Sequence, residues 1–342
     1  MSTHHKAHNV VVVGASAGGV EALQTLFSAL DPQLDACFLV VMHIPTQPQS
    51  NLHLILSRAT AMPVIAAHED QPLRAGAVYV ATADRHLMLD ERGVRVTRGP
   101  RECRVRPAID VLFRSAAVTH GKRVIGVVLS GALDDGTAGL WAIKDCNGLA
   151  LVQDPVEAPH SSMPRSAIEH VAVDFVGSLQ QLAEQINALV RAEAPAAQTD
   201  AAAVNEHYFI ENQISLTGKG LEAGVFRLGK VSRYSCPDCH GVLVEIKEGP
   251  ITRFRCHTGH AYSVKTLISA VNDSIDTALW DTLRALEERI LLLRQMADLA
   301  GKAGNAGDAA DCLRQAERAE ARLQPLRELV LDPQMFGSNE AG

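Results

Sequence analysis

The chain has 342 residues, 47% of them hydrophobic and 21% charged, and a formal net charge of −7. This balance is typical of a globular protein with two or three domains, and the acidic charge argues against nucleic acid as a partner, because phosphate binding needs a basic face. The polar first ten residues do not resemble a secretory signal and no apolar run is as long as a membrane span, so we expect a cytoplasmic protein that is not embedded in a membrane.

The first half of the chain alternates short apolar runs with helical patterns. Runs rich in Val, Ile and Leu, as in strands buried on both faces, predict strands at residues 9–13, 37–43, 63–67, 123–130 and 149–153. Helical spacing predicts helices at residues 18–30, 48–60, 107–120, 136–147 and 162–170. The alternation predicts an α/β fold with a doubly wound, mostly parallel sheet. Three short alternating runs within residues 77–97 predict antiparallel strands attached to that sheet.

The run "GASAG", residues 14–18, follows the first predicted strand and precedes a helical pattern. A dinucleotide fingerprint would need glycine where Ser16 stands, and a P-loop would need lysine after Gly19, so a phosphate-binding turn is disfavoured. The run does match G-x-S-x-G, the strand–turn–helix motif that exposes a nucleophilic serine. The helix that follows would supply amide groups and a positive dipole end for an oxyanion.

Partners for a nucleophilic serine are found at the ends of two other predicted strands. His43 ends the second strand, and Asp134 and Asp135 follow the strand at residues 123–130. A packed histidine and helix-capping aspartates are the alternative interpretations of these residues taken singly. Because functional groups gather at the carboxyl ends of parallel strands, their joint position favours a serine–histidine–aspartate hydrolase.

Four stretches together are similar to the catalytic domain of the chemotaxis protein-glutamate methylesterase (CheB) family: "VVVGASAGGVEAL", "VVMHIP", "LSGALDDGTAGL" and "VQDPVEAPHSSMPRSAIEHV". The resemblance implies the Rossmann-like CheB methylesterase fold over residues 8–194. It implies a serine carboxylesterase that hydrolyses glutamyl methyl esters on the cytoplasmic helices of methylated chemoreceptors, and in some members a glutamine deamidase. It further implies Ser16 as nucleophile, His43 as base and Asp135 as orienting group, with no cofactor for catalysis.

The chain departs from the usual CheB pattern in three places. Ala17 stands where threonine is common and Ala132 where methionine is common, and the resemblance implies that Ala17, Gly18 and Ala132 form the oxyanion and substrate loop. Family members usually begin with a phosphorylatable receiver domain, whereas the first predicted strand here begins at residue 9. We therefore expect no receiver in this chain, and a separate receiver or methyltransferase protein as a further partner.

Three of the seven cysteines lie at metal-ligand spacing. The pattern C-x₂-C-x₁₆-C-x₃-H predicts a small zinc ribbon at residues 231–268, with Cys236, Cys239, Cys256 and His260 as ligands and His240 and His257 as competitors for the fourth position. Four protein ligands would close the site, so we expect a structural Zn²⁺ ion. The remaining cysteines are scattered, which indicates a reducing compartment and no disulfide framework.

The regions around the predicted ribbon have no catalytic motif. Residues 195–230 begin with an Ala- and Pro-containing polar stretch and are predicted to be a linker. Residues 272–331 are predicted to form a helical hairpin, through which the chain would form a homodimer. Two other functions remain open: a non-catalytic CheB-like binding module in a signalling complex, and a nucleotide-binding Rossmann domain.

Overall fold

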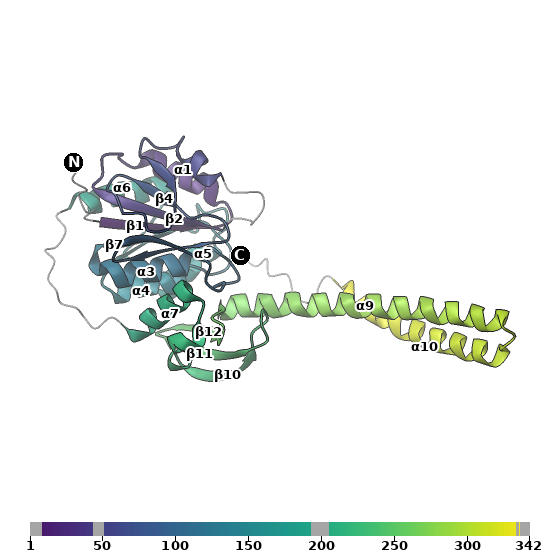
Figure 1. Ribbon diagram of the computed structural model, residues 1–342. Helices are drawn as coiled ribbons and strands as arrows, with labels where there is room; N and C mark the ends of the chain where they lie inside the picture. Colours follow the sequence, from purple (N-terminus) through teal and green to yellow (C-terminus); the bar gives the residue numbers. More distant parts are fainter. Residues whose placement is uncertain (1–8, 44–50, 193–204, 333–334, 336–342) are drawn as a thin grey trace. The chain divides into compact units, whose positions relative to one another are not determined.

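The computed structural model describes residues 9–43, 51–192, 205–332 and 335. The chain divides into two compact units, one reaching Leu267 and the other beginning at Ile268. A seven-stranded parallel sheet in the order β3-β4-β2-β1-β7-β8-β9 forms the centre of the first unit (Figure 1). Its strands are β1 (Asn9–Ala15), β2 (Ala36–Met42), β3 (Val64–Ala66), β4 (Val78–Val80), β7 (Val124–Val128), β8 (Leu149–Gln153) and β9 (Phe175–Gly177).

Helices cover both faces of this sheet. On one face lie α1 (Gly19–Ala29), α2 (Leu52–Leu56) and α6 (Leu179–Arg191), and on the other α3 (Ile109–His120), α4 (Thr137–Asp145) and α5 (Ser162–His170). Alternate side chains of β1 enter opposite cores, Val11 and Val13 beside α1 and Val10 and Val12 beside α3. The strand order reverses between β1 and β7, so the carboxyl ends of these strands flank a switch point, where α/β proteins commonly bind ligands.

The segment predicted as three antiparallel strands differs in the structure. Strand β4 is parallel and lies between β3 and β2. Its central residue Tyr79 is fully buried, and its hydroxyl group is satisfied there by donating to the carbonyl of Pro72. Only β5 (His86–Asp90) and β6 (Gly93–Thr97) are antiparallel, and they form a separate two-stranded sheet.

The predicted linker is wrong for its described part. Residues 205–230 contain α7 (Glu206–Thr217), the single turn α8 (Gly220–Ala223) and a 3₁₀ turn (Val225–Arg227). Helix α7 buries Glu211 and Ser215 completely, so the segment packs against the rest of the first unit, whereas the linker was predicted from the Ala- and Pro-containing stretch before it. Residues 195–204, the start of the predicted linker, lie outside the described part of the chain.

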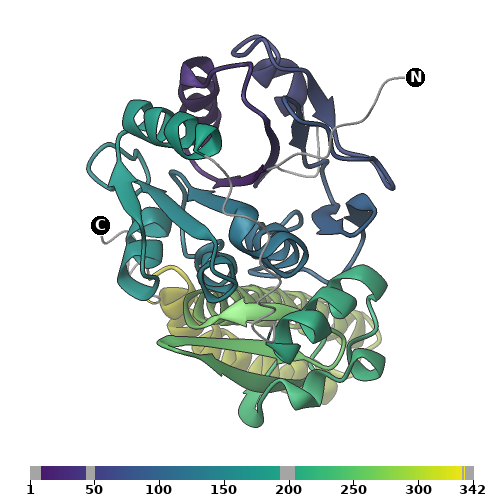
Figure 2. The same ribbon diagram turned by 90° about the vertical axis from the view of Figure 1, so that its left-hand side faces the viewer.

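A four-stranded antiparallel sheet adds a fourth layer to the first unit. It consists of β10 (Lys230–Ser235), β11 (Val242–Glu248), β12 (Ile251–Cys256) and β13 (Ala261–Ser263). Figures 1 and 2 show it outside α3 and α4, on the side away from the parallel sheet. The layers are tightly packed, since a Cβ on Gly249, in the β11–β12 turn, would lie 2.3 Å from the Trp141 ring of α4. The metal-ligand sequence therefore does not form a separate domain.

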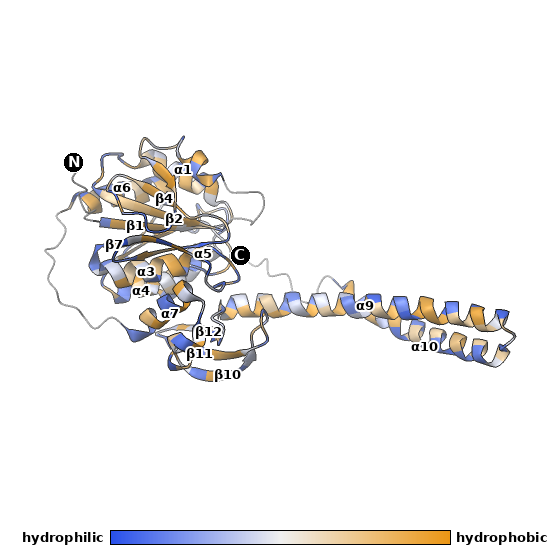
Figure 3. Cartoon of the chain, viewed as in Figure 1, coloured by the Kyte–Doolittle hydropathy of each residue, from blue (hydrophilic) through white to orange (hydrophobic). Residues whose placement is uncertain are grey.

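The second unit consists of most of α9 (Val264–Lys302) and of α10 (Ala306–Val330). The two helices pack against each other through a small apolar core: Leu283, Ile290, Leu293, Ala316, Ala319 and Leu323. Figure 3 shows hydrophobic and hydrophilic residues alternating along both helices. The hairpin was expected from residue 272, and α9 begins eight residues earlier, directly after β13.

Candidate active site and metal centre

Ser16 lies in the tight turn between β1 and α1. The turn is closed by a hydrogen bond from the Gly19 amide to the Ser16 carbonyl, 2.8 Å long. Gly18 has a left-handed backbone with φ of 71°, a conformation that favours glycine. The Ser16 amide donates to the carbonyl of Ser130 after β7, at 2.9 Å, which joins the turn to the neighbouring strand. Ser16 is therefore held at the switch point of the sheet.

His43 directly follows β2 and faces the serine. Its amide donates to the carbonyl of Ala15 at 3.2 Å, and its Nδ1 lies 2.9 Å from the Ser16 hydroxyl oxygen. Its other ring nitrogen, Nε2, lies 2.7 Å from Oδ2 of Asp135. A neutral imidazole with its proton on Nε2 would donate to Asp135 and accept from Ser16. The three residues that the sequence singled out thus form one continuous hydrogen-bonded chain.

Asp135 is 2% exposed and is held by backbone amides. Its Oδ2 accepts from the amide of Ile109 at 2.7 Å, and its Oδ1 accepts from Asp110 and Gly136 at 3.0 Å each. Two of these donors are the first amides of α3, where the helix dipole also favours a negative charge. The carboxylate is therefore fixed before any substrate binds.

Asp134, the neighbouring candidate, has a different partner. Its Oδ1 accepts from the hydroxyl of Ser263 at 2.7 Å, so Asp135 alone of the two aspartates contacts His43. Burial raises the pKa of Asp134 above its usual value. The backbone around this pair is unusual, with φ of 63° at Leu133 and 96° at Gly136. The two neighbouring carboxylates thus have different partners, Ser263 for Asp134 and His43 for Asp135.

A buried carboxyl that sequence reasoning did not identify supports the same loop. Asp110 accepts from the amides of Gly136 and Gly139 at 2.9 and 2.6 Å, so it caps the start of α4. Burial and the negative charge of Asp135 raise the pKa of Asp110 well above its usual value, which favours its neutral form. An aspartate at the first turn of a predicted helix looks like an ordinary cap in the sequence, so no local signal separates it.

The turn beside Ser16 is also supported by Ser130, which the sequence analysis did not single out. The Ser130 hydroxyl donates to the carbonyl of Ala17 at 2.8 Å and accepts from the amide of His160 at 3.1 Å. The next residue, Gly131, lies so close that an added Cβ would be 2.8 Å from the Ser16 Cβ. No described residue accepts a hydrogen bond from the amides of Ala17, Gly18 or Ala132, the expected oxyanion donors.

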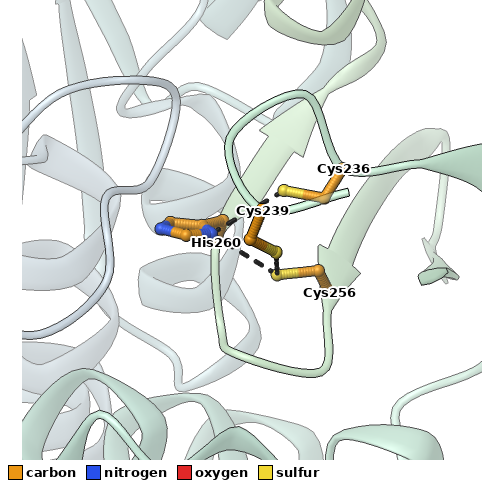
Figure 4. A group of neighbouring side chains, drawn as sticks. All are labelled: Cys236, Cys239, Cys256 and His260. Carbon is orange, nitrogen blue, oxygen red and sulfur yellow. Dashed lines mark hydrogen bonds between the residues drawn. The ribbon is translucent and has the colours of Figure 1, made fainter. Parts of the chain in front are cut away.

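The four expected metal ligands cluster in the antiparallel sheet. Cys236 and Cys239 come from the β10–β11 turn, Cys256 ends β12, and His260 precedes β13 (Figure 4). Their potential ligand atoms all lie within 4.8 Å of one another. His260 Nδ1 is 3.7 and 3.6 Å from the sulfurs of Cys236 and Cys256, and the sulfurs of Cys239 and Cys256 are 3.6 Å apart.

These spacings fit a tetrahedral zinc ion. Zinc–sulfur bonds of about 2.3 Å at tetrahedral angles place two sulfurs about 3.8 Å apart. His260 belongs to the cluster. His240 and His257, the other candidates for the fourth ligand, lie outside it. Tyr262 adds an outer contact, since its hydroxyl lies 3.3 Å from the sulfur of Cys236 and donates to Asp238 at 2.6 Å.

Comparison with known proteins adds a family relationship. The sequence model of the family described as CheB methylesterase matches residues 11–186. A protein of Anaeromyxobacter dehalogenans named protein-glutamate methylesterase/protein-glutamine glutaminase 2 is 38% identical over 182 residues, which are 53% of either chain. A shorter protein of Leptospira interrogans, provisionally named for the same two activities, is 38% identical over 178 residues, or 92% of its length and 52% of this chain.

A solved structure shows the same relationship. The crystal structure of the Thermotoga maritima CheB methylesterase catalytic domain is 28% identical to this chain and superposes with a TM-score of 0.51. The match covers 98% of that domain and 53% of this chain. Among the described residues, no helix is long and apolar enough to cross a membrane.

Proposed function

Because this chain belongs to the CheB methylesterase family, we propose that it hydrolyses glutamyl methyl esters on proteins, with Ser16, His43 and Asp135 as its catalytic triad. The observation that supports this proposal most strongly is the chain of contacts from the Ser16 hydroxyl through both ring nitrogens of His43 to Asp135, at 2.9 and 2.7 Å. A packed strand-end histidine would not need a serine on one nitrogen and a fixed carboxylate on the other.

The reaction follows from these contacts. Ser16 Oγ attacks the ester carbonyl while His43 Nδ1 takes its proton, and Asp135 stabilises the imidazolium through Nε2. The amides of Ala17, Gly18 and Ala132 are the proposed donors to the oxyanion, since no described residue occupies them. The His43 imidazolium then gives its proton to the departing methoxide, which leaves as methanol. A water molecule, deprotonated by His43, hydrolyses the acyl-serine to glutamate. The same route would deamidate a glutamine, with ammonia as the leaving group.

The proposed substrates are the cytoplasmic helices of a methylated chemoreceptor, and a separate receiver or methyltransferase protein is the proposed regulatory partner. The names of the relatives support an ester or amide on a protein side chain as the reacting group. We propose that the chain acts in the cytoplasm, where such helices are accessible, and that the hairpin of α9 and α10 mediates a homodimer.

The metal centre is proposed to hold one structural Zn²⁺. Three cysteine sulfurs and one imidazole nitrogen form a closed, four-ligand set of the kind that zinc prefers. An ion with four protein ligands has no open position for substrate or water, so its contribution would be to join the β10–β11 turn to the end of β12. The esterase reaction itself needs no metal in this scheme.

The proposed function is tested by methanol release from a methylated chemoreceptor. We expect release by the wild-type protein and a loss of about 10⁴-fold or more for Ser16→Ala, the size of loss typical for a triad member. If wild type and Ser16→Ala were equally inactive on methylated receptors and on receptor glutamines, the non-catalytic binding module would be the better description.

A further inference from the structure

Six charged side chains are buried between α3 and the C-terminal module, which is defined here as residues 205–267. They are three glutamates and three arginines, none more than 6% exposed: Glu102, Arg114, Glu211, Glu248, Arg253 and Arg255. Glu211 of α7 lies at the centre, and its Oε1 accepts from Arg253 Nη1 and from Arg255 Nη2 at 2.8 Å each. The charges balance: four of the six side chains belong to the module, and Glu102 and Arg114, which precede it, form a pair of their own.

This network fastens the module to α3. Arg114 of α3 donates to Glu102 at 2.8 Å, and Arg255 of β12 reaches the same carboxylate at 2.9 Å. Displacing the module would break the contact of Arg255 with Glu102 and the hydrogen bonds of Arg114 to Asn212 and Ser215. The module is therefore joined to α3 and to the segment before it by several buried polar contacts.

Helix α3 is the element whose first amides hold the triad carboxylate. Ile109 and Asp110 donate to Asp135, and Arg114 lies about one turn further along the same helix. A shift of α3 that followed loss of the network would therefore move the donors that fix Asp135. The buried charges contact α3 at Arg114, and the triad carboxylate contacts the same helix at its first amides, about one turn away.

A second contact reaches the active-site loop directly. Ser263, the last residue of β13, donates its hydroxyl to Asp134, the neighbour of Asp135, at 2.7 Å. Ser263 lies three residues after the metal ligand His260. Strand β13 is itself bound to the segment before α3, because Ala261 exchanges backbone hydrogen bonds with Arg101 and Cys103 at 3.1 and 2.9 Å.

We propose that the C-terminal module positions the triad, with Ser263 as a positioning residue for the Asp134–Asp135 loop and the metal-bearing sheet as its anchor. The module touches neither the serine nor the substrate in this scheme, and it acts on turnover by holding Asp135 against His43. The inference rests on the proposed function, because it assumes that Asp135 takes part in ester hydrolysis.

The first test is a set of full-length variants assayed for kcat and KM. Ser263→Ala removes the hydroxyl and is expected to lower kcat about tenfold with KM nearly unchanged, because small misplacements of catalytic groups reduce turnover. Ser263→Thr keeps a hydroxyl and is expected to restore most of the rate. Ser232→Ala, on β10 at the opposite edge of the sheet, is the matched control. A wild-type kcat in Ser263→Ala would overturn the proposal.

The second test does not depend on enzymatic activity. Hydrogen exchange of the peptides spanning residues 107–112 and 131–137 is expected to be faster in Ser263→Ala and in metal-depleted full-length protein, and to return to the wild-type rate when Zn²⁺ is added. Unchanged exchange in both samples would contradict the positioning role. An inactive wild type with faster exchange in the variant would instead overturn the proposed function and leave the positioning role supported.

Discussion

Nε2 of His43 lies 2.7 Å from Oδ2 of Asp135, and each oxygen of that carboxylate also accepts from at least one backbone amide. Asp135→Asn would place an NH₂ group against an N–H donor and would disturb the imidazole tautomer. We expect kcat for methanol release to fall about 10⁴-fold. Asp70→Asn is the matched control, because Asp70 is exposed and has φ of 56°, a conformation that asparagine accepts. Equal rates in Asp135→Asn and the control would remove Asp135 from the triad.

Gly131 has no room for a side chain beside the proposed nucleophile. A Cβ there would lie 2.1 Å from the sulfur of Met163 and 2.8 Å from the Cβ of Ser16. The methionine can move, whereas Ser16 cannot without losing its contact with His43, so we expect Gly131→Ala to lower kcat by about 10²-fold. Gly301→Ala, with nothing within 4 Å of the added methyl group, should leave the rate unchanged.

The proposed metal centre predicts the number of zinc ions bound per chain. Elemental analysis of protein purified without chelator should find about one zinc per chain, the value for a single four-ligand site. Cys239→Ser should lose most of the bound metal and lower the melting temperature, whereas Cys312→Ser, on α10 outside the cluster, should keep both. Metal-free wild-type protein with an unchanged melting temperature would contradict a structural zinc site.

The buried charge network predicts a large loss of stability. Glu211→Gln removes the carboxylate that Arg253 and Arg255 share, although Arg253 keeps Glu248 and Arg255 keeps Glu102. Breaking a buried ion pair costs about 3–5 kcal/mol in the free energy of unfolding. Urea denaturation measures the change. Glu222→Gln removes the same charge from an exposed pair with Lys219 and should have little effect. A Glu211→Gln protein as stable as wild type would show that the network does not hold the layers together.

His86 predicts a dependence of stability on pH. It is fully buried, its Nδ1 accepts from the amide of Ala108 at 3.2 Å, and its Nε2 lies 2.9 Å from the carbonyl of Pro100. Burial lowers its pKa from 6.5 to about 4. Between these values the unfolded chain binds a proton that the folded protein excludes, so His86 contributes stability above pH 6.5 that is lost as the pH falls towards 4.

The size of this pH effect follows from the two pKa values. At about 1.4 kcal/mol per pH unit, the loss attributable to His86 approaches about 3 kcal/mol. The difference in free energy of unfolding between wild type and His86→Gln should therefore shrink as the pH falls from 7 to 4.5. A difference that stays constant over this range would show that protonation of His86 is not coupled to folding.

The sequence by itself determined the elements whose signals are local. Valine-rich runs such as residues 9–13 and 123–130 predicted the parallel sheet, because strands buried on both faces must be apolar throughout. The G-x-S-x-G turn and the C-x₂-C-x₁₆-C-x₃-H spacing carried their chemistry within a few residues. Ser16, His43 and the four metal-site residues could be singled out for this reason.

Only the tertiary structure decided what depends on contacts between distant residues. The sequence pattern narrowed the acidic partner of His43 to Asp134 or Asp135, and family resemblance selected Asp135. In the structure, Asp135 contacts His43 and the first amides of α3, whereas Asp134 contacts Ser263. Glu211 looked like a solvated linker residue, yet it is buried because Arg253 and Arg255, more than 40 positions away, neutralise it. A buried charge is tolerated only beside its partner, and that partner is defined by the fold.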